Sequence, residues 1–144
     1  MTVAVTAILL AASPAPGQDG VDPEIADGSA QRALDAARER WRDAAIGSYR
    51  FRVRIECFCG PSFTRPAVIV VRHGRPVDPP RRLRGVATVP RLHRVVQGAI
   101  EDRVDGLSVR YGRRGVPRRV AINPSRMVFD EEITYVVDWI RARA

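Results

Sequence analysis

The chain has 144 residues, enough for one well-packed domain and too few for two. With 45% hydrophobic residues, 28% charged residues, two cysteines and no apolar run of about 20 residues, the composition excludes a wholly disordered chain, a disulfide-dense scaffold and a membrane-spanning helix. All 24 basic residues are arginines and the net charge is +8; they are spread along the chain without clustered aromatics, which indicates a solvated basic surface and disfavours nucleic acid as a partner.

The first 28 residues have the composition of an export segment followed by a linker. Residues 3–12 are apolar except for Thr6, and Ala15 and Gly17 place small side chains where a signal peptidase cleaves, although no basic residue precedes the run. Residues 18–28 are rich in Asp and Gly and contain no base. We therefore predict a signal peptide at residues 1–17, a flexible acidic tether at 18–28 and a secreted or cell-surface domain at 29–144; the alternative for the apolar run is a buried N-terminal strand or helix.

The first elements of the predicted domain are a helix and a strand. Ser29 is a suitable N-cap, apolar residues then recur with helical spacing, and Gly47 ends the helix. Residues 49–57 alternate between apolar and charged side chains, which predicts a strand with one face in a core and the other in solvent. The solvent-facing positions are Arg50, Arg52, Arg54 and Glu56.

The central part predicts a hairpin, an irregular strand and a second helix. Residues 67–72 are rich in Val and Ile and predict a strand, and His73-Gly74 predicts the tight turn after it. Residues 75–84 predict a third strand, which three prolines push to a sheet edge or make irregular. Thr88 caps the second helix, and Asp105-Gly106 ends it.

The last part predicts three more strands. Residues 107–111 alternate as the fourth strand, residues 112–115 form a loop, and residues 116–122 form the fifth strand. Residues 133–139 alternate as the sixth strand.

The predicted order is α-β-β-β-α-β-β-β, which makes the fold class α+β. An antiparallel sheet of about five or six strands buries its apolar side chains efficiently when both helices pack on one face. The other face then carries the arginines of residues 49–57 and stays open to water or to a partner.

The predicted domain carries a series of short motifs between residues 30 and 139. They are Arg40-Trp41-Arg42, Tyr49-Arg50-Phe51, Cys57-Phe58-Cys59, the hairpin at residues 68–74, Tyr111 with Gly115 and Pro117, and Asp130-Glu131-Glu132 before Ile133-Thr134-Tyr135. In combination they resemble a family of small bacterial exported and lipoprotein domains of unknown function, marked by a Y-R-F strand, a C-F-C motif and a late acidic D-D-E-like run. The resemblance implies an exported compartment and this fold, and it implies no particular activity.

The chain departs from that family pattern at three positions. Family members often carry Asp after the hairpin tyrosine, an aromatic residue before the proline and an acid at the end of the fifth strand. Here these positions are Gly112, Val116 and Asn123. If the family's acids form a site, that site is weakened in this chain.

Cys57 and Cys59 lie two residues apart at the end of a predicted strand. On a regular strand their Cα atoms would be about 6.5–7 Å apart, the outer limit for a disulfide, and a small bend before Gly60 would bring them together. In an oxidising compartment they would pair with each other. The alternatives are two buried free thiols, or a redox or metal role; redox pairs normally use C-x-x-C at a helix start, and a metal site needs more ligands.

The triplet Asp130-Glu131-Glu132 could bind a cation or supply a general acid, but it lacks the alternate spacing of a calcium loop. We expect these acids to pair with nearby arginines. The sequence contains no nucleophile elbow, phosphate-binding loop or metalloprotease helix, and the histidines, His73 and His93, fall in a turn and a basic helix. We therefore assign no catalytic residue, metal or cofactor.

These features predict a non-catalytic binding module at or outside the cell surface, with an unknown protein or an anionic polymer as its partner. The partner would dock on the open sheet face or on the late hairpin, and the candidate residues are Arg50, Arg52, Arg54, Arg113 and Arg114. One alternative is a polyanion or nucleic-acid binder, whose affinity would fall steeply with salt; it adds Arg81, Arg82, Arg118 and Arg119. The other is a small hydrolase or metal-dependent enzyme that uses the acidic triplet and a histidine.

Overall fold

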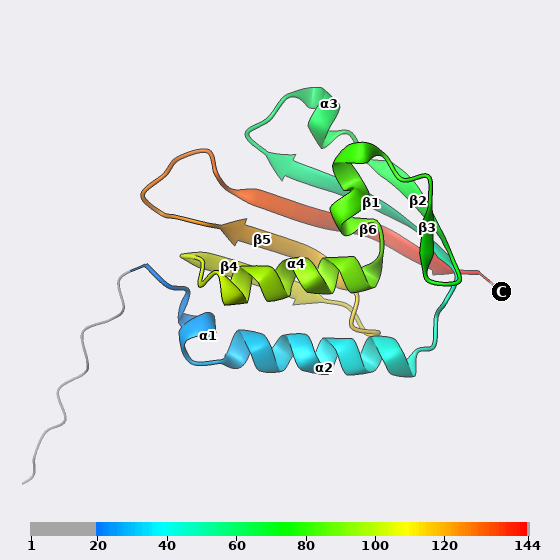
Figure 1. Cartoon of the computed structure of the whole chain (residues 1–144), viewed down its shortest axis with the longest axis horizontal. Coiled ribbons are helices and arrows are strands. Elements are labelled where there is room, and N and C mark those ends of the chain that lie inside the picture. The colour runs from blue at the N-terminus through cyan, green and yellow to red at the C-terminus, as the bar shows by residue number, and fades with distance from the viewer. Residues whose placement is uncertain (1–19, 144) are drawn as a thin grey trace, which may run out of the picture.

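The computed structural model describes residues 20–143 and shows one antiparallel sheet with its helices packed against it (Figure 1), which confirms the predicted α+β class. The predicted signal peptide at residues 1–17 lies outside the described residues. In chain order the elements are α1 (Pro23–Ala26), α2 (Ser29–Asp43), β1 (Tyr49–Cys57), α3 (Pro61–Thr64), β2 (Ala67–Arg72), β3 (Arg75–Val77), the 3-10 helix η1 (Arg81–Val86), α4 (Val89–Glu101), β4 (Gly106–Tyr111), β5 (Pro117–Asn123) and β6 (Ile133–Ala142).

The six strands lie in the order β3-β2-β1-β6-β5-β4, and every neighbouring pair is antiparallel. The last strand of the chain, β6, therefore sits in the middle and joins the two halves of the sheet. It pairs with β1 along the whole length of β1, from Cys57 opposite Ile133 to Tyr49 opposite Ala142, and so runs beyond the predicted end at Trp139.

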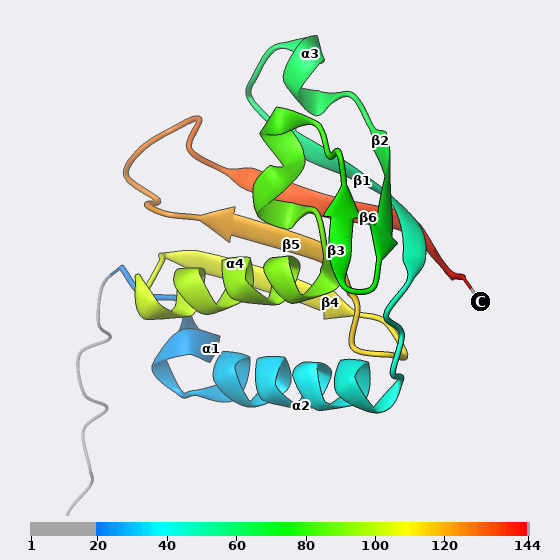
Figure 2. The ribbon, with the colours of Figure 1, turned by 45° about the vertical axis from the view of Figure 1, so that its right-hand side comes forward.

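The helices α2 and α4 lie over the same face of the sheet (Figure 2). Phe51 and Val53 of β1 are fully buried there with Leu92 of α4, and Leu34 of α2 packs in a second cluster with Val96 of α4. The apolar positions of the alternating strand thus face the helices, as its periodicity predicts. No helix among residues 20–143 has the length and apolar content needed to cross a membrane.

Both long helices begin at identifiable caps. The Thr88 hydroxyl accepts the Arg91 N–H at 3.2 Å, so Thr88 is the N-cap of α4, as predicted. The N-cap of α2 is Gly28 in the left-handed region, not Ser29, whose N–H instead donates to the Asp27 carboxylate at 2.8 Å. At its other end α4 stops at Glu101, before the predicted Asp105-Gly106 end.

Part of the predicted tether is folded. The Asp22 N–H donates to the Val104 carbonyl at 2.9 Å, and the Asp22 carboxylate accepts the N–H groups of Glu24 and Leu107 at 2.9 Å each. Asp22 thereby caps α1, and the Ile25 side chain is buried in the core. The expectation of a flexible segment fails here because two apolar side chains, Val21 and Ile25, and one capping carboxylate attach it to the domain.

The predicted third strand is wrong beyond its first three residues. β3 covers only Arg75–Val77, and the chain then turns into η1, whose Leu83 and Val86 side chains are buried. Pro79 and Pro80 lack the N–H groups that a longer ladder needs. β3 does lie at an edge of the sheet, as predicted, and the two prolines end it after Val77.

Candidate functional site

The open face of the sheet carries an ion-pair network rather than a bare arginine surface. The carboxylate of Asp138 in β6 forms ion pairs with Arg54 at 3.2 Å and with Arg52 at 3.5 Å. Glu56 pairs with Arg54 on its own strand and with Arg119 of β5 at 3.0 Å. Two of the predicted binding arginines are thus already neutralised by acids that the fold brings beside them.

An irregularity between β1 and β6 places Asp138 in this network. The register shifts between Arg52 and Val53, so that Arg52 lies opposite Trp139 and Val53 opposite Val137. Asp138 is the extra residue between them, a β-bulge, and its carboxylate reaches both Arg52 and Arg54.

The network shifts the pKa values of Glu56 and Arg54. Its hydrogen bond with Arg54, supported by Arg119, lowers the pKa of the Glu56 carboxyl. The same contact raises the pKa of the Arg54 guanidinium. Both groups stay charged and bound to each other over the physiological pH range, so neither is a candidate proton donor or acceptor.

A hollow of about 810 Å³ opens where the network reaches the disulfide end of the open face. Its polar lining includes Glu56 of β1, Arg119 and Asn123 of β5 and Thr134 of β6, which are neighbours across the sheet. Its rim comes from two loops, one after β1 and one between β5 and β6, and includes Phe58, Val128 and Phe129.

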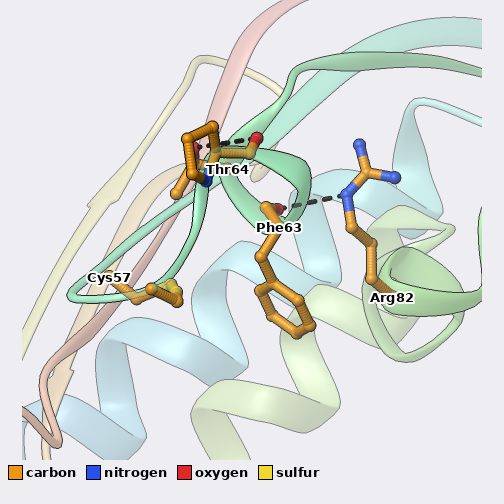
Figure 3. The surroundings of a disulfide bond; sticks show 6 residues. Cys57, Phe63, Thr64 and Arg82 are labelled. Carbon is orange, nitrogen blue, oxygen red and sulfur yellow. Dashed lines mark hydrogen bonds between the residues drawn. A yellow bond between two sulfur atoms is a disulfide. The ribbon is translucent and has the colours of Figure 1, made fainter.

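The first rim loop is shaped by the cysteines. Cys57, the last residue of β1, is paired with Cys59 in a disulfide, with the Cα atoms 5.2 Å apart, so the chain bends here as the spacing of the two residues requires. Phe58 lies between them and its side chain is 85% exposed. Arg82 of η1 holds the following helix, α3, because its Nε donates to the Phe63 carbonyl at 3.1 Å (Figure 3). The Arg82 guanidinium also donates to the Arg65 carbonyl.

The second rim loop connects β5 to β6. Ser125 shapes its start, because its hydroxyl accepts the Met127 N–H at 3.2 Å and its carbonyl accepts the Val128 N–H. The Arg126 N–H donates to Asp105 at 2.7 Å. This loop leaves Met127 87% and Phe129 88% exposed.

The sequence-based predictions did not include these exposed apolar residues of the two loops. A usable signal was present, since Phe58, Met127 and Phe129 sit among turn-forming residues such as Gly60-Pro61 and Pro124-Ser125 rather than in a periodic apolar pattern. Large apolar side chains at such positions lie outside the periodic patterns that indicate a helix or strand face in a core.

The acidic triplet behaves differently from the expectation. Asp130 and Glu132 line the hollow, and among residues 20–143 no ion pair involves any of the three acids. Glu132 instead accepts a hydrogen bond from the side-chain amide of Asn123 at 2.9 Å. The Asn123 amide oxygen is buried and has no hydrogen-bond partner. The pairing with arginines is therefore wrong for these acids.

The histidines do not reach the hollow. His93 is buried in α4, where its Nε2 lies 2.8 Å from the Gly115 carbonyl and burial lowers its pKa. His73 lies in the turn between β2 and β3. No group of three possible metal ligands occurs within the described part of the chain. The constellation that the hydrolase alternative requires is not assembled.

The second predicted arginine pair, Arg113 and Arg114, is separate from this site. Both are exposed on the hairpin between β4 and β5, at the end of these strands opposite to Asn123. The hairpin packs on α2, where the position of a Cβ on Gly115 would lie 1.9 Å from the Ala37 carbonyl oxygen. The structure thus does not bring Arg113 and Arg114 together with Arg52 and Arg54.

A further hollow of about 480 Å³ lies on the open face toward that hairpin. Four guanidinium groups line it together with one carboxylate, that of Asp138, and they belong to Arg54, Arg110, Arg118 and Arg119. Arg118 donates to the Asp138 carbonyl at 2.6 Å. Among the arginines proposed for polyanion binding, Arg82 already donates hydrogen bonds to two backbone carbonyls, those of Phe63 and Arg65.

The chain belongs to DUF6174, a family of unknown function whose model matches residues 33–142. The match runs from the first half of α2 to the last residue of β6, so the whole sheet and the hollow lie within it. No curated protein and no solved structure is detectably similar to the chain. The family establishes neither a ligand nor a reaction.

Proposed function

We propose that this member of the family is a non-catalytic binding module that engages a protein partner through the hollow at the disulfide end of its open sheet face. One observation carries the proposal: Phe58 and Phe129 come from two separate loops, are 85% and 88% exposed, and rim the same hollow. Exposed apolar side chains around a concavity mark interaction sites, because covering them with a partner removes their surface from water.

The polar lining supports binding rather than catalysis. The Glu56–Arg119 pair is locked by complementary charge, and Asn123 and Thr134 add groups that can orient a ligand. The lining contains no histidine, and its cysteine is held in the disulfide. The hollow therefore offers a partner polar groups on its floor and apolar side chains on its rim.

The proposed compartment is outside the cell or at its surface. The Cys57–Cys59 pair supports this, since a disulfide persists in an oxidising compartment and is reduced in the cytosol. The intact mass of the natural protein tests it, because the paired form lacks two hydrogens and export would shorten the N-terminus.

The test of the site replaces Phe58 or Phe129 with the photoreactive benzoylphenylalanine in cells that make the full chain. The matched control places the same group at Val77 of β3, an exposed apolar position at the far edge of the sheet. We expect a discrete protein adduct from both rim positions and none from position 77. No adduct, or the same adducts from all three positions, would contradict the proposal.

A second candidate function, anion binding, is favoured by the four arginines around the 480 Å³ hollow. It predicts that the protein elutes from heparin at a salt concentration that drops when Arg110 and Arg118 are changed to Ala. The control is Arg72→Ala, an exposed arginine on β2. Equal elution of all variants excludes it.

A further inference from the structure

We infer that the hollow at the disulfide end takes a polypeptide segment in which a basic side chain neighbours a large apolar one. The inference rests on the proposed function and specifies the chemistry of its partner. It follows from the lining carboxylates that have no cationic partner within residues 20–143, and from the exposed phenylalanines on the rim beside them.

The available polar groups are mainly hydrogen-bond acceptors. Glu56 and Arg119 satisfy each other, and Arg54 adds a second cation to Glu56. Glu132 receives only the neutral Asn123 amide, and no ion pair within residues 20–143 involves Asp130. The remaining cation of the lining is Arg126, so carboxylates outnumber guanidinium groups in a chain whose net charge is +8. Electrostatic complementarity therefore selects a cationic group for this place.

The rim supplies the apolar part of the contact. Phe58 is held between two disulfide-bonded cysteines, so its backbone is already ordered before a partner arrives. An aromatic side chain on an ordered backbone has only two side-chain torsions to fix on binding and is a good anchor. Phenylalanine rings also attract a cation placed over their faces, so Phe58 and Phe129 favour a basic side chain as well as an apolar one.

The same charges argue against two other occupants. An anionic lipid surface would be repelled by Asp130, Glu131 and Glu132, which directly follow Phe129. In a two-fold contact between copies of this chain, the same patch would face itself and bring like charges together. A foreign segment with basic and apolar side chains meets neither obstacle.

The experiment uses the full chain and three fluorescent peptides that share alternating Phe and Leu residues. Their remaining positions carry Lys, Gln or Glu, and binding is followed by fluorescence anisotropy at physiological salt. We expect the Lys peptide to bind saturably and the Glu peptide to bind at least about tenfold more weakly. Glu132→Gln should weaken the Lys peptide and leave the Gln peptide unchanged, whereas Phe58→Ser and Phe129→Ser should weaken both. Val77→Ser is the control and should change neither.

Several outcomes overturn the inference: equal binding of the Glu and Lys peptides, no peptide binding, binding to vesicles of anionic lipid that needs Phe58, or a dimer that the rim substitutions dissociate. The failures are distinguishable. If the photoreactive rim positions still capture one protein while the Glu peptide binds as tightly as the Lys peptide, the ligand chemistry is wrong and the proposed function stands. If the rim captures nothing, both fail.

Discussion

The phenol oxygen of Tyr49 accepts the backbone N–H of Val89 at 2.8 Å. This bond ties the start of β1 to the first residue of α4 inside the core, where Tyr49 also meets the Trp41 ring edge-on at 5.3 Å between centroids. Burial raises the pKa of Tyr49 to about 12, so the phenol stays neutral throughout the physiological range. One side chain thus links the sheet to both long helices.

Tyr49→Phe should lower the free energy of unfolding by about 1–3 kcal/mol, because it leaves the Val89 N–H buried without an acceptor. The matched control is Tyr111→Phe, which removes a buried hydroxyl that has no partner and should be neutral or stabilising. Urea denaturation of both variants measures the difference. Equal losses would show that the Tyr49 hydroxyl is not a structural bond.

Gly115→Ala should lower the free energy of unfolding by more than about 3 kcal/mol. Gly115 has a φ of +74°, and an added Cβ would lie 1.9 Å from the Ala37 carbonyl oxygen, so α2 would have to move. Gly74 has nearly the same φ, +75°, and open space around it, so Gly74→Ala isolates the backbone cost of about 1–2 kcal/mol. Thermal or urea unfolding compares the two, and a similar loss in both would contradict the close packing of the hairpin on α2.

The stability should fall as the pH drops below about 6.5, partly because of His93. Burial, with a smaller effect from Arg38, lowers the pKa of His93 below its ordinary value of 6.5 in the folded protein. Between that folded pKa and 6.5 the unfolded chain binds more protons, so acid favours unfolding, and the His93 contribution is fully present only above pH 6.5. Denaturation at about pH 7.5 and 5.5 should show a smaller pH effect in His93→Gln than in the wild type. An identical effect in both would refute this role.

Replacing both cysteines with Ser should cost less than about 3 kcal/mol of stability, because the disulfide closes a very short loop. The same variant should lose much of its affinity for the Lys peptide, because the backbone of Phe58 is then no longer held by the disulfide. Phe58→Ser, which keeps the disulfide, separates the two effects: it should lose binding and retain stability. A doubly substituted protein that binds as well as the wild type would show that the disulfide does not prepare the site.

The fold was predictable where periodicity carried the information. The alternation of residues 49–57 and the Thr88 cap indicated a sheet face and a helix start, and the structure contains both. The order of the strands was not predictable, because it depends on β6 returning to the centre of the sheet. The early end of β3 and the burial of Ile25 were not predictable either, because both depend on core contacts that no local sequence pattern reveals.

The candidate site was less predictable than the fold. The arginines of β1 were correctly placed on the open face, but their neutralisation by Asp138 arises from a bulge and from strand pairing. Phe58 lies far in the sequence from Phe129, Asp130 and Glu132, and only the folded chain brings the two loops to one hollow. Such a meeting is a property of the tertiary structure.

The most direct test of the proposed binding site is a map of backbone amide chemical shifts as the Lys peptide is added to the full chain. We expect the largest changes on the two rim loops and on Glu56, Asn123 and Thr134. The amides of Arg113 and Arg114, at the far end of β4 and β5, should stay unchanged. If the largest changes fall on that hairpin, or on the arginine-lined hollow beside Arg110 and Arg118, the peptide binds elsewhere and the proposed site is wrong.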